Sequence, residues 1–159
     1  MSEPLVATPS QTVGPFFHFG LTSQPNGRLV DRLPAGEAIS LVIAVTDGDV
    51  KPVADAVIEL SQTGAFGRMP TGEDGTCEFQ TTRPTSHINV CLFARGLLRQ
   101  LHTRIYFPDG GGLAQDPVLA LVPANRRPTL MAVTDPESPT TWRFQIRLQG
   151  LEETVFFDV

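Results

Sequence analysis

The segment "WRFQIRLQ", residues 142–149, is the clearest indication of the fold in this sequence. Apolar side chains at positions 142, 144, 146 and 148 alternate strictly with Arg or Gln at the positions between them. A period of two residues is typical of a β-strand that has one face on the core and the other in solvent. The segment therefore predicts a sheet with one face packed against an apolar layer.

Similar segments recur along the chain, separated by turns rich in Gly, Pro and Asp. The other predicted strands are residues 39–45, 55–60, 76–82, 87–95, 99–107 and 154–159. One short helix is predicted after Asp116 as N-cap, with Pro117 as its first residue and Pro123 ending it. Residues 1–159 thus indicate one all-β domain, a β-sandwich of about seven to eight mostly antiparallel strands with one short helix.

An extended N-terminal arm is predicted over residues 1–20. Its central stretch, "TPSQTVGPFFHFG" at 8–20, has two prolines, two glycines and three phenylalanines, and it shows neither a helical nor a strand period. Such a composition predicts an irregular segment. Residue chemistry alone favours an arm that covers a sheet edge.

Composition excludes several classes of function. A net charge of −5 and a pI near 5.1 give no basic stripe for nucleic acid. The longest apolar runs, such as 41–45, are too short to span a bilayer. The N-terminus lacks the features of a secretion signal, so we expect a cytoplasmic protein that binds no membrane. Cys77 and Cys91 fall in predicted strands and are expected to be reduced core or sheet residues.

The predicted strand 87–95 has one apolar and one partly polar face. Its even-numbered positions are apolar, whereas His87, Asn89 and Arg95 share the opposite face. His87 and Asn89 would point the same way, but Asn is a poor companion to imidazole at a transition metal. The three histidines of the chain have no compact ligand spacing, so no metal site is expected. A site built on His87 and His102 remains a weaker alternative.

Five segments carry a resemblance to a known family, and they read in order "TPSQTVGPFFHFGL", "SHINVCLFARGLL", "TRIYFPD", "DPVLALVPANRRPTL" and "RFQIRLQGLEETVFFDV". Together they resemble the alpha chains of the protocatechuate 3,4-dioxygenases, which are intradiol ring-cleaving dioxygenases. In that family a β-sandwich alpha chain pairs with a homologous beta chain. The beta chain holds a non-haem Fe(III) with two tyrosines and two histidines, the histidines coming from an H-x-H pair on one strand.

The resemblance implies an iron-free subunit of an (αβ)n hetero-oligomer that cleaves protocatechuate with O2 to 3-carboxy-cis,cis-muconate. His87 and Asn89 occupy the H-x-H position with the second histidine replaced, and Tyr106 is the one tyrosine of the chain. We therefore expect the beta subunit to bind the Fe(III). This chain is expected to supply no metal ligand and no catalytic residue of its own.

The resemblance also implies which residues line the partner's substrate pocket: Thr12, Gly14, Pro15 and Arg95. A guanidinium at position 95 suits the carboxylate of a dihydroxybenzoate. The alternative for Arg95 is a surface arginine paired with a nearby acid. The neighbouring phenylalanines would anchor the arm against core and partner, and they are Phe16, Phe17 and Phe19.

Two loops are shorter than in the family, one near residues 61–70 and one near 82–87. Surface loops tolerate such shortening, but contacts between subunits that depend on them are in doubt. The shortening motivates an alternative from another functional class, a stand-alone β-sandwich binding or scaffold protein that has lost the enzymatic partnership.

Overall fold

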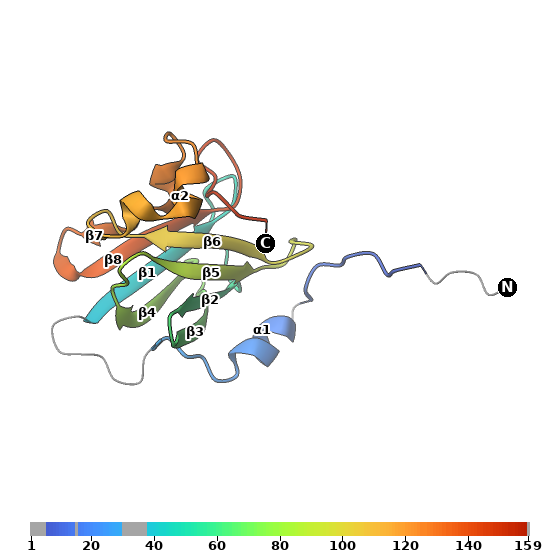
Figure 1. The fold of residues 1–159 in the computed structure, drawn as a ribbon. Coiled ribbons are helices and arrows are strands. Elements are labelled where there is room, and N and C mark those ends of the chain that lie inside the picture. The colour runs from blue at the N-terminus through green and yellow to red at the C-terminus, as the bar shows by residue number, and fades with distance from the viewer. Residues whose placement is uncertain (1–5, 15, 30–37, 159) are drawn as a thin grey trace.

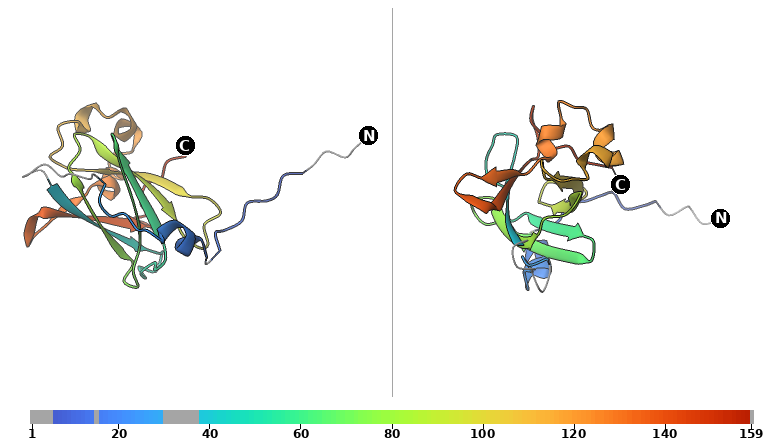
Figure 2. Two further views of the ribbon diagram at one scale, coloured as in Figure 1. Left: turned by 90° about the horizontal axis from the view of Figure 1, so that it is seen from below. Right: turned by 60° about the vertical axis from the view of Figure 1, so that its left-hand side comes forward.

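Two four-stranded sheets form the body of the molecule in the computed structural model, which describes residues 6–14, 16–29 and 38–158. The strands are β1 (Ala38–Thr46), β2 (Val57–Gln62), β3 (Ala65–Pro70), β4 (Thr76–Thr82), β5 (His87–Phe93), β6 (Leu101–Tyr106), β7 (Val133–Asp135) and β8 (Ser138–Arg147). The helices are α1 (Phe16–Thr22), α2 (Pro117–Leu121) and two 3-10 turns, η1 (Leu113–Gln115) and η2 (Arg127–Leu130). Figures 1 and 2 show the two sheets facing each other, with α2 at one end of the sandwich.

One sheet has the strand order β4-β1-β8-β7 and the other has the order β3-β2-β5-β6. Neighbouring strands are antiparallel except β1 and β8, which run parallel with Leu41 opposite Trp142. The predicted β-sandwich of mostly antiparallel strands is therefore confirmed. The predicted strand 142–149 is also present, although β8 begins earlier, at Ser138, and ends at Arg147.

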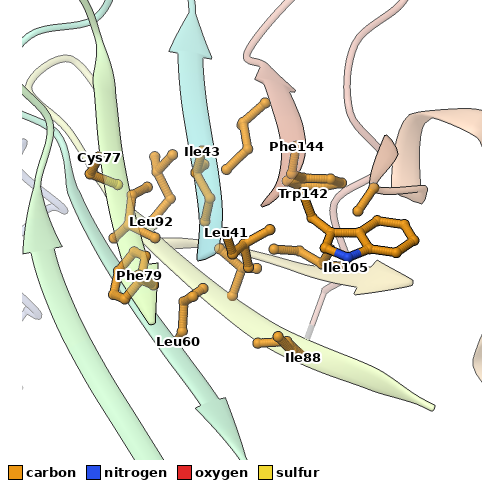
Figure 3. Packing of buried hydrophobic residues seen from close by; sticks show 14 of the residues in the cluster. Leu41, Ile43, Leu60, Cys77, Phe79, Ile88, Leu92, Ile105, Trp142 and Phe144 are labelled. Atoms are coloured by element: carbon orange, nitrogen blue, oxygen red, sulfur yellow. The ribbon is translucent and has the colours of Figure 1, made fainter. Parts of the chain in front are cut away.

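The core lies between the sheets, where alternate residues of each strand point inward (Figure 3). Trp142, Phe144 and Ile146 are buried, as the period of two predicted. Trp142 packs edge to face on Phe107, with ring centroids 5.0 Å apart. Cys77 is buried in this core and Cys91 is half-buried, both as free thiols, which confirms the prediction for them. Burial raises the pKa of the Cys77 thiol to about 12.

A second apolar cluster covers one end of β6. In this cluster Tyr106 packs with Leu119 of α2, with Val122 just after α2, and with Leu130 of η2. The Asp116 carboxylate caps α2 by accepting hydrogen bonds from the backbone N–H groups of Val118 and Leu119. The helix predicted after Asp116 is thus confirmed, and its cap places a carboxylate beside β5 and β6.

Three elements were not predicted from the sequence. Residues 16–22 form α1 although the stretch 8–20 was expected to be irregular, and α1 buries none of its residues. A helix without an apolar face leaves no periodic signal. Strand β3 ends in Pro70 and depends on hairpin pairing with β2, while β7 has only three residues. Both strands therefore rest on tertiary pairing more than on local preference.

The predicted strand 154–159 is wrong. The described part of this segment lies beside β6 and pairs at a single point, where the Phe157 N–H donates to the His102 carbonyl. The Thr103 hydroxyl holds the segment at a second place by donating to the Val155 carbonyl at 2.7 Å. The segment is therefore held by two separate hydrogen bonds and does not form a continuous ladder with β6.

The N-terminal arm leads away from the sandwich from Gly14 back to Val6, as Figure 1 shows. After it, α1 lies against β3, where the Arg68 guanidinium donates to the Leu21 carbonyl at 3.5 Å. An extended arm is therefore present, with one short helix at its base. No helix in the described ranges is long and apolar enough to cross a membrane.

The turn before β4 requires a glycine for two reasons. Gly75 has a φ of +72°, and a Cβ there would lie 2.7 Å from the Val45 carbonyl oxygen. Gly64 has a similar φ of +73°, but no heavy atom lies within 4 Å of the place that a Cβ would take. We expect Gly75→Ala to lower the free energy of unfolding by roughly 3 kcal/mol, against about 1 kcal/mol for Gly64→Ala. Urea denaturation of the two variants measures this difference, and equal losses would contradict the steric argument.

Candidate functional site

The N-terminal arm and the β5–β6 turn meet at one end of the sandwich. The Thr12 hydroxyl accepts a hydrogen bond of 2.7 Å from the backbone N–H of Gly96. Gly96 has a φ of +91°, a conformation that turns the chain after Arg95 and exposes its N–H. The structure therefore brings together Thr12 and Arg95, two of the predicted site residues, from distant parts of the sequence.

A shallow hollow lies between the arm and this turn. It has a volume of about 210 Å³ and takes one wall from Gln11 and Val13 of the arm. The rest of the lining comes from the end of β5 and the turn, with apolar Phe93, Ala94, Leu97 and Leu98 and polar Arg99 and Gln100. Mostly apolar walls suit the flat face of an aromatic ring or an apolar side chain of another protein. The hollow is open to solvent in this chain.

Arg95 lies at the rim of the same turn and carries an ion pair. Its Nε is 2.6 Å from Oδ2 of Asp55, and its side chain is 57% exposed. The sequence-based alternative of a surface arginine paired with a nearby acid thus describes its contact in the isolated chain. Asp55 itself was not anticipated, because nothing in the sequence relates it to a residue 40 positions away.

Gly14 lies two residues beyond Thr12 and is uncovered. Among the described residues, its chain neighbours aside, no heavy atom lies within 4 Å of where a Cβ would be. The Gly14 carbonyl accepts a hydrogen bond from the Phe17 N–H at the start of α1. An uncovered glycine allows another molecule to approach the backbone closely. The fourth predicted pocket residue, Pro15, lies outside the described residues.

The aromatic residues of α1 do not pack on the core. Phe16 is 79% exposed and Phe19 is 68% exposed, and their rings contact each other at a centroid distance of 6.4 Å. The expectation that they anchor the arm against the core is therefore wrong for these two residues. Large apolar side chains gathered on one exposed segment are typical of a surface that contacts another molecule.

A second polar group of residues surrounds the predicted His87–Asn89 position. His87 Nδ1 lies 2.9 Å from the Ser86 hydroxyl and 3.2 Å from Asp116 Oδ2. Asn89 shares this face of β5 and is exposed, opposite Arg104 of β6. His102 stands four residue pairs farther along the β5–β6 ladder, roughly 13 Å from His87. The two histidines are therefore too far apart to share an ion.

The Asp116 carboxylate is the centre of this group. It is 6% exposed and accepts hydrogen bonds from the Tyr106 phenol and the Ser86 hydroxyl, each at 3.0 Å. Arg104 lies 3.5 Å away. Burial alone would raise the pKa of Asp116, but hydrogen bonds from the Leu119 N–H and these hydroxyl groups together hold it below its usual value. Asp116 thus stays ionised while it joins β5, β6 and α2.

Two neighbours of Asp116, His87 and Tyr106, stay neutral at neutral pH. Burial lowers the pKa of His87, and the nearby positive charge of Arg104 lowers it further. Burial likewise raises the pKa of the Tyr106 phenol. An uncharged imidazole and an uncharged phenol around one carboxylate make a hydrogen-bonded support, because each donor has its acceptor within the group.

These residues do not fit a ferric ion. The phenol of Tyr106 is buried and donates to Asp116, and Asn89 supplies only an amide, so His87 would be left as a single ligand through its Nε2. Across the described part of the chain, no three His, Cys, Asp or Glu side chains gather closely enough to hold a metal ion. Ferric iron prefers phenolate, carboxylate and imidazole ligands that remain free to coordinate.

Comparison with known proteins identifies the family. The chain is 40% identical over 194 aligned positions to the protocatechuate 3,4-dioxygenase alpha chain of Burkholderia cepacia, covering 98% of each protein. It is 37% identical to the alpha chain of the same name from Pseudomonas putida, again with 98% coverage of both. This chain belongs to the family of protocatechuate 3,4-dioxygenase alpha chains. No protein-family model matches it.

Solved structures agree on the fold of this alpha-chain family member. The dioxygenase domain of a dioxygenase–carbohydrate-binding fusion from Streptomyces sp. SirexAA-E superposes with a TM-score of 0.62 at 21% identity, covering 82% of this chain and 89% of that domain. The Burkholderia cepacia alignment spans 194 positions, whereas the chain has 159 residues, so gaps fall on the side of this chain. This agrees with the shortened loops inferred from the sequence.

We expect the Asp116 carboxylate to stabilise the fold mainly above acidic pH. Its pKa is lowered in the folded state, so its contribution is present above the unfolded value of 3.8 and is lost as the pH falls through that region. The pKa of His87 is also lowered in the folded state. Below about pH 6.5 the unfolded chain therefore binds a proton more readily than the folded protein does, and the stability of the fold decreases further. Asp116→Asn should lower Tm at pH 7 by roughly 5–10 °C.

Thermal unfolding between pH 3 and pH 8 checks this expectation. The gap in Tm between the parent protein and Asp116→Asn should narrow below pH 4, where the parent carboxylate also becomes protonated. Asp158→Asn is the control, since this acid is 82% exposed and pairs with the exposed Arg99. A surface pair contributes at most about 1 kcal/mol, so the control should retain its Tm. An unchanged Tm for Asp116→Asn at pH 7 would contradict the central role of this carboxylate.

Proposed function

We propose that this chain is the iron-free alpha subunit of a protocatechuate 3,4-dioxygenase. With an Fe(III)-bearing beta subunit it would cleave protocatechuate with O2 to 3-carboxy-cis,cis-muconate, as part of the cytoplasmic catabolism of aromatic acids. The observation that carries the proposal is the end-to-end match to proteins that bear the alpha-chain name, at 40% and 37% identity with 98% coverage. A stand-alone scaffold is not favoured, because these relatives match over nearly their whole length.

The ligand groups of this chain support the proposed division of labour between the subunits. Tyr106 and His87 are engaged with Asp116, and Asn89 stands where the resemblance expects a histidine. Such a set does not supply two phenolates and two imidazoles. We therefore assign the Fe(III), and the ring-opening chemistry that depends on it, to the beta subunit of an (αβ)n assembly.

This chain would contribute one wall of the substrate pocket. Thr12 accepts a hydrogen bond from Gly96, the residue that follows Arg95, which supports a shared function for the arm and the β5–β6 turn. Gly14 is uncovered, so a flat ring can approach its backbone, and Pro15 would restrict the arm at the next position. The guanidinium would attract the carboxylate of protocatechuate, and the arm would exclude water from the ring.

The exposed side of α1 would contact the partner. In this proposal residues 1–159 form one domain, and residues 1–20 are its N-terminal arm. Phe16 and Phe19 expose most of their surface in the isolated chain, and aromatic residues contribute strongly to binding when buried at an interface. Assembly would cover them without any change in the sandwich.

Expression with and without a cognate beta chain tests the proposed function. We expect the isolated alpha chain to be colourless, free of stoichiometric iron and inactive toward protocatechuate. The co-expressed complex should be coloured and should consume protocatechuate and O2 in equal amounts. Iron analysis and oxygen uptake measure both properties. A colourless monomer beside its partner, or a coloured and active isolated chain, would contradict the proposal.

Removal of the exposed aromatic rings should separate folding from assembly. We expect the double variant Phe16→Ser, Phe19→Ser to keep the Tm of the isolated chain within about 2 °C, because neither ring is buried in it. The same variant should bind the beta chain at least roughly tenfold more weakly, as measured by light scattering or by co-purification yield. Leu151→Ser is the control, since Leu151 is fully exposed in a different part of the chain. Full assembly of the double variant, or loss of assembly in the control alone, would overturn the assignment of this surface.

A further inference from the structure

We propose that Asp55 is a positioning residue for Arg95 and holds its guanidinium in the orientation that receives the carboxylate of the substrate. The proposal rests on the function proposed above, in which Arg95 faces the bound substrate. Asp55 lies in the connection between β1 and β2, and its Oδ2 is 2.6 Å from the Nε of Arg95. The two residues belong to different sheet connections, so the contact is a product of the fold.

The backbone conformation at Asp55 bears on which residues can occupy this position. Its φ is +65°, in the left-handed region, where glycine is least strained. Asp and Asn are the other residues that adopt this region with modest strain. This φ is therefore compatible with an aspartate, and the ion pair with Arg95 is the contact that its carboxylate makes among the described residues.

The turn that carries Asp55 is rigidly held. The buried Thr71 hydroxyl donates to the Val53 carbonyl at 2.8 Å and accepts from the Ala56 N–H at 2.9 Å. The Thr71 N–H donates in turn to the Ala56 carbonyl. These bonds clamp the backbone on both sides of Asp55. The fixed partner of the ion pair is therefore Asp55, and the flexible partner is the long side chain of Arg95.

The contact leaves the guanidinium free to bind a second anion. Arg presents five N–H donors in a planar fork, and the Asp55 contact runs through the Nε side. Within the described ranges Arg95 forms no ion pair with another acid. Its terminal amino groups can therefore receive a second carboxylate. The neighbouring Gly96 N–H holds Thr12, so the orientation of Arg95 is set relative to the arm that would cover the substrate.

Orientation outweighs the opposing charge of Asp55 at this exposed site. A free arginine side chain loses rotamer entropy when it is immobilised by a ligand, and a side chain already held loses less. The negative charge of Asp55 would oppose a second anion, but the guanidinium is itself positive and has separate N–H donors for two carboxylates. We therefore expect removal of the Asp55 charge to weaken binding of the substrate.

Asp55→Asn in the assembled enzyme tests the inference. Asn has the same size and tolerates the left-handed conformation, so the turn is retained. We expect KM for protocatechuate to rise about 3- to 10-fold, with kcat changed less than about twofold. Binding of 4-methylcatechol, which keeps the two hydroxyl groups and lacks the carboxylate, should stay unchanged. Asp49→Asn is the matched control, because it removes one exposed charge from the same β1–β2 connection, where Asp49 pairs with Lys51.

A double-mutant cycle shows whether Asp55 acts through Arg95. Arg95→Ala should raise KM for protocatechuate with iron content unchanged, and Asp55→Asn should cause no further rise in that background. Additive losses, a lower KM for Asp55→Asn, or a change no larger than that of Asp49→Asn would overturn the inference. An assembled parent complex that does not cleave protocatechuate would instead contradict the proposed function.

A measurement on the isolated chain tests the inference even if the assembled complex does not cleave protocatechuate. The NMR signal of the Arg95 Nε–H group, assigned by its loss in Arg95→Ala, should be sharp in the parent chain and in Asp49→Asn. In Asp55→Asn we expect the same signal to broaden through exchange with water. An equally sharp signal in Asp55→Asn would mean that Asp55 does not order the guanidinium, and it would overturn the inference whatever the activity of the complex.

Discussion

The register of β5 is the constraint on which both candidate regions depend. Ile88, Val90 and Leu92 are buried against the opposite sheet, so a slip of one residue would exchange the two faces of the strand. With the register fixed, His87 and Asn89 lie on the outer face near α2. Arg95 follows at the other end, where the chain turns toward the arm. Strand β5 thereby lies between two regions. At one end is the polar group around Asp116, whose members hydrogen-bond to one another, and at the other is the open hollow beside Arg95.

The closed group around Asp116 holds one end of the sandwich together through contacts between protein groups. Asp116 joins β5, β6 and α2 through hydrogen bonds from Ser86 and Tyr106 and from the start of the helix. Polar groups that satisfy one another in this way gain stability from their low-dielectric surroundings. The same contacts occupy the phenol of Tyr106, which is therefore not free to coordinate an ion. A support of this kind is compatible with a subunit whose chemistry lies in another chain.

The open site has the opposite character. Its hollow is bounded on one side by an arm that the hydrogen bond from Gly96 to Thr12 ties to the sandwich. Gly14 is uncovered, and the aromatic rings of α1 are exposed. Apolar surface, a free backbone and a partly neutralised guanidinium do not form a pocket by themselves. We propose that they form one wall of a pocket completed by a partner, which agrees with membership of a family of alpha chains.

The sequence by itself determined the β-sandwich, the inward faces of its main strands and the cap of α2. Alternation and capping are local sequence patterns, and the residues that they predict to be buried or capping are buried or capping in the structure. The resemblance of its motifs to the family predicted Thr12 and Arg95 as pocket residues. Only the tertiary structure decided that the arm ends in a helix, that residues 65–70 form a strand, and that the C-terminal segment does not. It alone joined Asp55 to Arg95 and Asp116 to His87. Contacts between residues tens of positions apart depend on how the sheets are connected in space, and no local period of side chains encodes that geometry.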